Sequence, residues 1–195
     1  PFITALGVGG LAVSLALKDT LADFFSGLHI LLSRKVSPGN FVELDTGERG
    51  YIENITWRNT SMKERTNNII SIPNARLSTA IVRNFNAIDS RFRVTVDVGV
   101  AYDSDLEQVR EVTLDVARQV VRDVPGAVKD FEPIMRYVQF AESSINFQIL
   151  FSVMKYGDQH MVVDEFIRRL HKRYQQENIE IPFPIRTIIQ RKDEA

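Results

Sequence analysis

The sequence has 195 residues, no cysteine and a formal net charge of −1 at pH 7. This length suits one or two domains. The near balance of 24 basic and 25 acidic residues argues against a nucleic-acid partner, and the lack of cysteine excludes disulfides, thiolate catalysis and cysteine metal sites.

The first 17 residues carry no charge and are rich in glycine, alanine and leucine. On a helix, Gly7, Leu11, Leu15 and Lys18 form one narrow stripe, because they lie at i, i+4, i+8 and i+11. Small residues flank this stripe, with Gly10 and Ser14 on one side and Thr4, Val8 and Ala12 on the other. Small residues let helices approach closely in lipid. The run is therefore interpreted as a pore helix in a ring of identical copies, with its leucines facing the axis.

Length alone leaves a second interpretation of this run open. A bilayer-spanning helix needs roughly 17 to 25 apolar residues, so a buried core helix of a soluble protein is the alternative. A signal-peptide core is disfavoured, because no basic leader precedes the run. Apolar character resumes over residues 24–32 after Asp23, which predicts a second, interfacial helix within residues 1–33. The basic junction at 33–39 marks the cytoplasmic side, with an ordinary basic loop as the alternative.

From Asn40 the apolar period changes to two. Short strands are predicted at residues 41–44, 50–55, 57–64, 68–72 and 81–85, separated by turn sequences. Pro73 ends the fourth strand. Five short strands at this spacing predict a small, strongly bent barrel over residues 34–90.

Residues 91–178 read as a compact α+β layer. A strand at 91–100 precedes a capping box, Ser104 to Glu107, which opens a helix to about Asp123. A hairpin of 136–141 and 145–153 and a helix at 159–177 complete a sandwich with helices on one face of a sheet. The helices are expected to bury Leu106, Val109, Thr113, Val116, Ala117, Val120 and Val124, and Val162, Phe166, Leu170 and Tyr174.

The last segment, 179–195, contains two prolines, Pro182 and Pro184. Each removes a donor from a sheet ladder, so residues 179–189 are predicted to form an edge strand or a strand paired only with copies of itself. A frayed tail follows from Arg191.

No catalytic or metal constellation is found, so no enzyme and no cofactor are expected. The three histidines are scattered along the chain: His29, His160 and His171. Helix capping explains Asp103 and Asp105 better than a carboxylate pair does. The aromatic residues that might stack on bases are instead expected in the core: Trp57, Phe85 and Phe92.

Several motifs in order give the chain a family likeness. They are Gly10-Leu11-Ala12-Val13 with Leu15-Ala16-Leu17, Ser71-Ile72-Pro73-Asn74, Asn84-Phe85, Gly99-Val100-Ala101-Tyr102-Asp103-Ser104-Asp105-Leu106, Ser143-Ser144-Ile145-Asn146-Phe147 and Ile181-Pro182-Phe183-Pro184. With these motifs the chain resembles the small-conductance mechanosensitive channel (MscS) family over almost its whole length.

The resemblance implies a multi-pass membrane protein of the α+β class in the cytoplasmic membrane, assembled as a homoheptamer. Residues 1–33 would hold the pore-lining and interfacial helices, and 34–90 a β-barrel resembling the Sm fold. Residues 91–178 would form a ferredoxin-like cytoplasmic domain, and 179–195 would give one strand to a C-terminal barrel and a tail. By similarity, helices that sense tension lie upstream of this sequence.

The resemblance also assigns roles to residues. Leu11 and Leu15 would form two constriction rings that gate by dewetting. The flanking small residues would pack between neighbouring helices: Thr4, Val8 and Ala12 against Gly7, Gly10 and Ser14. Lys18 would form a basic ring at the inner end of the pore, with a modest anion preference as the hypothesis.

The remaining assignments concern helix bends and the membrane boundary. Asp19 stands where the family often has a kink-forming glycine, so the bend is expected at Gly27 instead. Arg34 matches a basic position at the membrane boundary, and Lys35 replaces the proline usual after it.

The implied function is a channel opened by membrane tension that releases ions and small solutes on hypo-osmotic shock, with membrane lipids as partners. The alternative is a membrane-tethered oligomeric binding module that uses the Sm-like barrel. A channel that responds chiefly to a ligand or to crowding also stays open.

Overall fold

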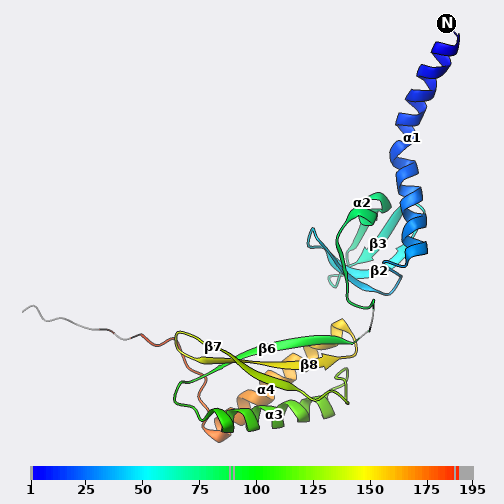
Figure 1. The fold of residues 1–195 in the computed structure, drawn as a ribbon. Coiled ribbons are helices and arrows are strands. Elements are labelled where there is room, and N and C mark those ends of the chain that lie inside the picture. Colours follow the sequence, from blue (N-terminus) through cyan, green and yellow to red (C-terminus); the bar gives the residue numbers. More distant parts are fainter. Residues whose placement is uncertain (1, 88, 90, 187, 189–195) are drawn as a thin grey trace, which may run out of the picture. The chain divides into compact units, whose positions relative to one another are not determined.

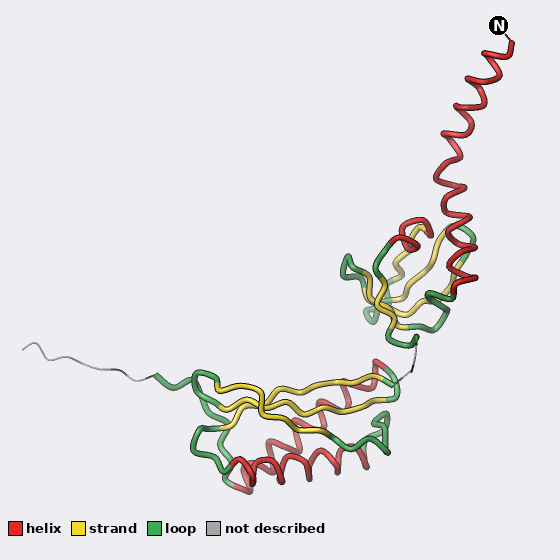
Figure 2. The backbone as a smooth tube through the Cα atoms, viewed as in Figure 1, coloured by secondary structure: helices red, strands yellow, loops and turns green. Residues whose placement is uncertain are grey.

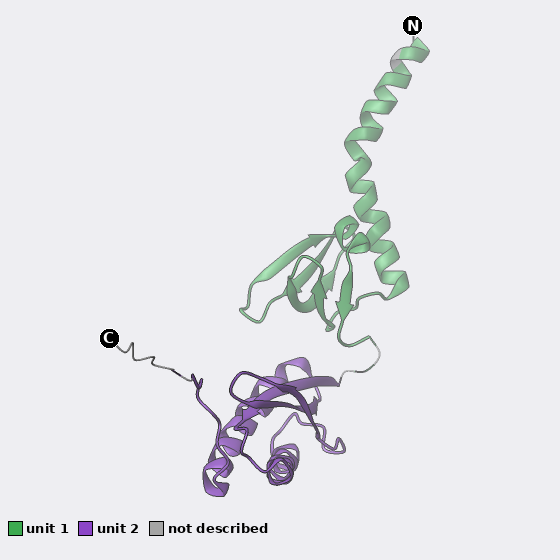
Figure 3. Ribbon diagram, turned by 60° about the vertical axis from the view of Figure 1, so that its left-hand side comes forward, with its two compact units in different colours: residues 1–90 green, residues 91–195 purple. Residues whose placement is uncertain are grey.

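The computed structural model describes residues 2–87, 89, 91–186 and 188; its ribbon is drawn in Figure 1 and its helices and strands are distinguished in Figure 2. The chain forms two compact units, residues 1–90 and 91–195 (Figure 3). Each unit has its own hydrophobic core.

The first unit begins with α1 (Phe2–Ser33), one uninterrupted helix of 32 residues (Figure 1). The sequence predicted a membrane helix and a separate interfacial helix, and the structure instead joins both pieces. Residues 18–23 contain neither proline nor glycine, so nothing in their backbone ends the helix.

A five-stranded antiparallel sheet follows α1, with strand order β4-β3-β2-β1-β5. The strands are β1 (Phe41–Leu44), β2 (Arg49–Ile55), β3 (Asn59–Lys63), β4 (Ile69–Pro73) and β5 (Val82–Asn84). The five predicted strands are therefore confirmed, and a bulge between Ile52 and Asn54 bends β2.

Two sequence-based expectations in this unit need correction. The third strand begins at Asn59, so Trp57 lies in the turn before it and is 56% exposed rather than in the core. A short helix, α2 (Asn74–Thr79), was not predicted, because Pro73 was interpreted only as the end of a strand. Proline also suits the start of a helix, where no backbone donor is needed.

The core of this unit draws on both helices as well as the sheet. Its buried members are Ile30 of α1, Leu77 of α2, and Val36, Val42, Leu44, Ile52, Met62 and Ile72. The C-terminal part of α1 is thus an integral part of the β-domain.

The second unit has the predicted order of elements. They are β6 (Phe92–Val100), α3 (Leu106–Asp123), β7 (Ile134–Phe140), β8 (Ile145–Val153), the 3₁₀ turn η1 (Tyr156–Asp158) and α4 (Gln159–Glu177). The sheet is antiparallel with order β6-β8-β7, and α3 and α4 cover one of its faces (Figures 1 and 2).

The predicted helix faces form the core of this unit. All four residues predicted for α4 are buried, from Val162 to Tyr174. On α3, Val112 and Val121 are buried in addition to the predicted set, and Leu106 is only partly buried. The hydroxyls of Thr113 and Tyr174 lie 2.6 Å apart and join the two helices inside the core.

The cap of α3 differs from the prediction. Asp105, not Ser104, is the N-cap residue, and its Oδ1 accepts hydrogen bonds from the amides of Glu107 and Gln108 at 2.9 and 3.3 Å. The helix therefore starts one residue later than the capping-box pattern indicated, and aspartate is as effective a cap as serine.

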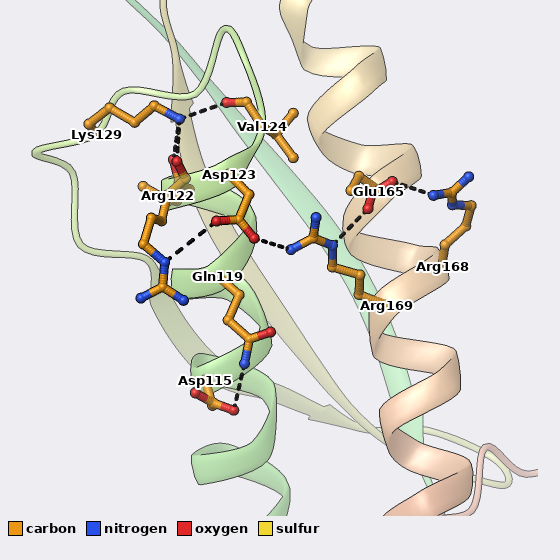
Figure 4. A network of polar contacts seen from close by, with 10 residues as sticks. Asp115, Gln119, Arg122, Asp123, Val124, Lys129, Glu165, Arg168 and Arg169 are labelled. Atoms are coloured by element: carbon orange, nitrogen blue, oxygen red, sulfur yellow. Dashed lines mark hydrogen bonds and ion pairs between the residues drawn. The ribbon is translucent and has the colours of Figure 1, made fainter.

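Ion pairs join the C-terminal end of α3 to α4 (Figure 4). Arg169 donates to Asp123 and to Glu165, both at 2.7 Å, and Arg168 also donates to Glu165. These hydrogen bonds hold the pKa of the Asp123 and Glu165 carboxyls below their ordinary values.

The end of α3 is also closed by Lys129, from the loop that follows (Figure 4). Its ammonium donates to the carbonyls of Val121, Arg122 and Val124 at 2.8, 2.8 and 2.9 Å. A cation at this position satisfies carbonyls that have no helical partner and opposes the negative end of the helix dipole.

The C-terminal segment has no assigned strand over the described residues 178–186. Its Glu180 carbonyl accepts from the amide of Ala101 at 3.1 Å, and the amide of Ile185 donates to the Ser143 hydroxyl at 3.0 Å. An edge strand, one of the two predicted alternatives, is therefore not seen in these residues, and a strand paired between copies of the chain stays a prediction. The expected frayed tail from Arg191 lies outside the described residues.

Candidate pore helix and its junction with the β-domain

The N-terminal two thirds of α1 are not covered by any other part of the described chain. No described side chain is buried before Asp23, and Leu11 and Leu15 are 68% and 75% exposed. The 21 residues from Phe2 to Ala22 span about 32 Å at 1.5 Å per residue, close to the hydrocarbon thickness of a bilayer. In length and composition, α1 is suited to cross a membrane.

The residues predicted to line the pore or to pack between helices all lie on this uncovered part. They are Thr4, Gly7, Val8, Gly10, Leu11, Ala12, Ser14, Leu15 and Lys18. A Cβ atom built on Gly7 or Gly10 would meet nothing within 4 Å. Their predicted contacts are between copies of the chain, so their roles stay predictions.

The next turn of α1 carries Asp23, which lies against the start of α2. This carboxylate is only 7% exposed, and its Oδ1 accepts a hydrogen bond from the amide of Ala75 at 2.9 Å. Its Oδ2 lies 3.8 Å from Nε of Arg58. A carboxylate at a helix N-terminus accepts from free amides and complements the helix dipole, so α1 supplies the cap that α2 lacks.

The first residue of α2 joins the same junction. Asn74 is fully buried; its Oδ1 accepts from the Thr60 hydroxyl and its Nδ2 donates to the Thr56 carbonyl, each at 2.9 Å. A single side chain thus connects α2 to both ends of the β2–β3 turn, with its donor and acceptor satisfied.

Gly27 of α1 faces this asparagine at very short range. A Cβ atom at residue 27 would lie 2.5 Å from Nδ2 of Asn74 and 2.8 Å from the carbonyl oxygen of Trp57. The glycine therefore permits close approach of α1 to the β-domain. The bend predicted at Gly27 stays a prediction, as does the hinge role of Asp19, which is exposed on the same continuous helix.

The other end of α2 is held by the segment that follows α1. Nζ of Lys35 donates to the carbonyls of Ala80 and Ser78 at 2.8 and 3.4 Å. The hydroxyls of Ser78 and Ser26 lie 3.3 Å apart midway along the contact. A carboxylate at one end and an ammonium at the other thus match the dipole of α2.

This contact gives Lys35 a structural role that the sequence did not suggest, beside its predicted place at the membrane boundary. Arg34, predicted for the same boundary, is exposed at the end of α1 and has a positive φ of 52°. The boundary roles of both residues stay predictions.

Sequence reasoning missed this junction because its members are far apart in the chain. In the sequence, Asp23 marks only the point after which apolar character resumes. Asn74 is there only the last residue of the motif Ser71-Ile72-Pro73-Asn74. The signal in the sequence that indicates them is a polar residue in an apolar helix, together with a proline–asparagine pair after a strand. Among the described residues, no group of three or more His, Cys, Asp or Glu is placed to hold a metal ion.

These features define a class of protein in which a long apolar helix is docked on a small β-domain, which leads into an α+β domain. Family models agree with this division. Residues 19–87 match the mechanosensitive ion channel β-domain, and residues 94–181 match the C-terminal domain of the mechanosensitive ion channel MscS. The chain belongs to the MscS family of mechanosensitive ion channels.

Individual relatives support the same assignment. The small-conductance mechanosensitive channel MscMJ of Methanocaldococcus jannaschii is 28% identical over 98% of this chain and 54% of its own length. The low conductance mechanosensitive channel YnaI of Escherichia coli is 31% identical over 75% of this chain and 42% of its own length. The chain thus spans about half the length of the curated relatives it matches, which are channels rather than enzymes.

Solved structures share the fold. The crystal structure of Helicobacter pylori MscS in its closed state has a TM-score of 0.81 at 27% identity, over 98% of this chain and 74% of that one. Arabidopsis thaliana MSL1 has a TM-score of 0.68 at 17% identity, over 93% of this chain and 65% of that one, and supports the fold alone.

Proposed function

We propose that this chain is the pore-lining and cytoplasmic part of a channel that membrane tension opens. On hypo-osmotic shock the channel releases ions and small solutes. It is a homoheptamer in the cytoplasmic membrane, and further helices of the full-length protein cross the membrane as well. The C-terminal part of the chain lies in the cytoplasm. Residues 179–189 of each copy add one strand to a shared barrel.

The observation that carries this proposal is the uncovered apolar part of α1. This apolar segment, exposed over about 30 Å, is stable only if lipid or other copies of the chain cover it. In a ring, Leu11 and Leu15 face the axis and the glycine-rich flanks allow close helix contact. A narrow ring of leucines excludes water, and an ion cannot pass without its hydration shell.

The junction with the β-domain suits this function because it holds the lower end of α1 firmly. Asp23, Gly27 and Ile30 fix the helix against α2 and the β2–β3 turn. When tension widens the ring, the uncovered part of α1 tilts while the docked part transmits force to the β-domain.

The test is patch recording from the full-length protein in liposomes under suction. Leu15→Ser makes the proposed constriction wettable, so the variant is expected to open at lower tension than the wild type. Leu17→Ser is the matched control, because residue 17 lies about 200° around the helix from Leu15. This variant is expected to open at the same tension as the wild type.

Each outcome of this experiment decides between the two functions. Pressure-dependent unitary currents with the shift only in Leu15→Ser support the channel and place its gate. Silence in the wild type and in both variants, in patches where a control channel opens, would favour the membrane-tethered binding module.

Lys18 supplies a separate test of the pore. Seven exposed ammonium groups at the inner end would favour anions modestly. Lys18→Gln is expected to move the reversal potential in a salt gradient toward the cation side. Lys35→Gln is the control and is expected to leave the reversal potential unchanged, because the Lys35 ammonium binds carbonyls of the β-domain. A wild-type reversal potential that favours cations would contradict the basic ring.

A further inference from the structure

The sheet of the second unit has one face that neither α3 nor α4 covers (Figure 2). Alternate residues of each strand point to this face. Six of them line a hollow of about 290 Å³: Arg93 and Thr95 of β6, Ile134 and Arg136 of β7, and Gln148 and Leu150 of β8. The opposite face of the sheet is the apolar core.

The strand register places two arginines on opposite sides of this hollow. Thr95 and Ile134 are each paired with Leu150 of the central strand, so these three form one row across the sheet. Arg93 is paired with Ser152, in the next row along one direction of the central strand. Arg136 is paired with Gln148, in the next row along the other direction. With strands about 4.8 Å apart and about 6.8 Å between rows, their Cα atoms are about 17 Å apart diagonally. Two extended arginine side chains that reach toward each other span this separation if one small ligand group lies between their guanidinium groups.

The two arginines are the only charged residues among those that line this hollow. Both arginines are exposed, and within the part of the chain that the structure describes neither guanidinium group forms an ion pair or a hydrogen bond. No acidic residue lines the hollow. Asp97 lies on the same face, in one row with Arg136 and with Gln148 between them, and its Oδ1 accepts from Nε2 of Gln148 at 2.9 Å.

Other exposed arginines of the same unit contrast with these two. Arg118 pairs with Glu132 at 2.7 Å and Arg173 with Glu177 at 3.0 Å. An anion bound between the two arginines of the hollow is attracted by both of them.

We propose that this hollow binds a small oxyanion, a carboxylate or phosphate group, between Arg93 and Arg136. Guanidinium groups bind such oxygens in bidentate fashion, and the Thr95 hydroxyl supplies a further donor. Leu150 and Ile134 form an apolar floor that strengthens these bonds by excluding water. The proposal does not depend on the channel activity, since binding is measured without current.

The test is calorimetric titration of the full-length protein in detergent with inorganic phosphate and, separately, with potassium glutamate. Ionic strength is held constant with potassium chloride. Arg93→Gln and Arg136→Gln are each expected to weaken binding at least tenfold, because each removes a charged bidentate donor. Arg118→Gln, an exposed arginine on α3 with a carboxylate partner, is the matched control and keeps wild-type affinity.

Hydrogen exchange with and without the anion locates the site. Slower exchange in peptides of β6 and β7 in the wild type, lost in the two variants, supports the proposal. Preference for phosphate over glutamate, or the reverse, identifies which group occupies the hollow. Equal binding by all four proteins, or no binding beyond that of chloride, would overturn the proposal, whether or not the channel conducts.

Discussion

Replacing Gly27 by alanine distinguishes a hinge from a contact residue. In an exposed helix this change stabilises the helix by about 1 kcal/mol, since alanine is the better helix former. In this structure the added methyl group would lie 2.5 Å from Nδ2 of Asn74 and 2.8 Å from the Trp57 carbonyl. Ordinary contact begins at 3.4 Å, so the amide nitrogen would have to withdraw by about 0.9 Å (3.4 minus 2.5).

The expected cost follows from what surrounds the methyl group. Inserting one carbon into a packed site costs about 1–3 kcal/mol. Moving Asn74 also weakens its bonds to Thr60 and Thr56, each worth about 1 kcal/mol. After the helix-propensity gain, we expect a net local loss of about 2 kcal/mol at the junction of α1 and α2.

Hydrogen exchange of the full-length protein in detergent measures this loss. Amides of α2 should exchange about 30-fold faster in Gly27→Ala, the ratio that corresponds to 2 kcal/mol. Gly9→Ala is the matched control, because a Cβ atom there meets nothing within 4 Å in the chain. Unchanged or slower exchange of α2 in Gly27→Ala would refute the close-contact reasoning and favour a hinge.

Three further predictions concern the second unit. Lys129→Met removes three hydrogen bonds to the end of α3 and should destabilise that end by about 1–2 kcal/mol, seen as faster amide exchange there. Burial raises the pKa of Tyr174 to about 12. Between about pH 10 and 12 the unfolded chain loses this proton while the folded chain keeps it, so urea midpoints should fall with rising pH, less so in Tyr174→Phe. The lowered pKa values of Asp123 and Glu165 stabilise the fold above about pH 4.5, and this contribution is lost as pH falls through them. Arg169→Gln should flatten that acid decline, and an unchanged acid slope would count against the ion-pair network.

Local patterns in the sequence located most of the regular elements, but they missed α2 and divided α1 into two helices. The 3.6-residue period located α4 and all four of its predicted core residues, because one helix face must be apolar to pack on the sheet. The period of two located the five strands of the first unit. The uncharged run at the start predicted a helix, which α1 confirms; its place in a membrane stays a prediction.

Other features depended on residues that the chain brings together from a distance. Gly27 was interpreted from its helix alone, and only the fold places Asn74 and the Trp57 carbonyl against it. Asp23 caps a helix that begins 51 residues later, at Asn74. Trp57 is exposed because the turn, not the strand, contains it.

The sequence by itself therefore determined the strands of both units, the apolar faces of α3 and α4, and the family. These properties follow from residues near one another along the chain, whose periodicity is set by backbone geometry. Only the tertiary structure decided which polar groups satisfy each other, as at Asp23 and Lys35 on either end of α2, and which are left without a partner in the described chain, as at Arg93 and Arg136. Such pairing depends on distances across the fold, and those distances are not encoded in any local pattern.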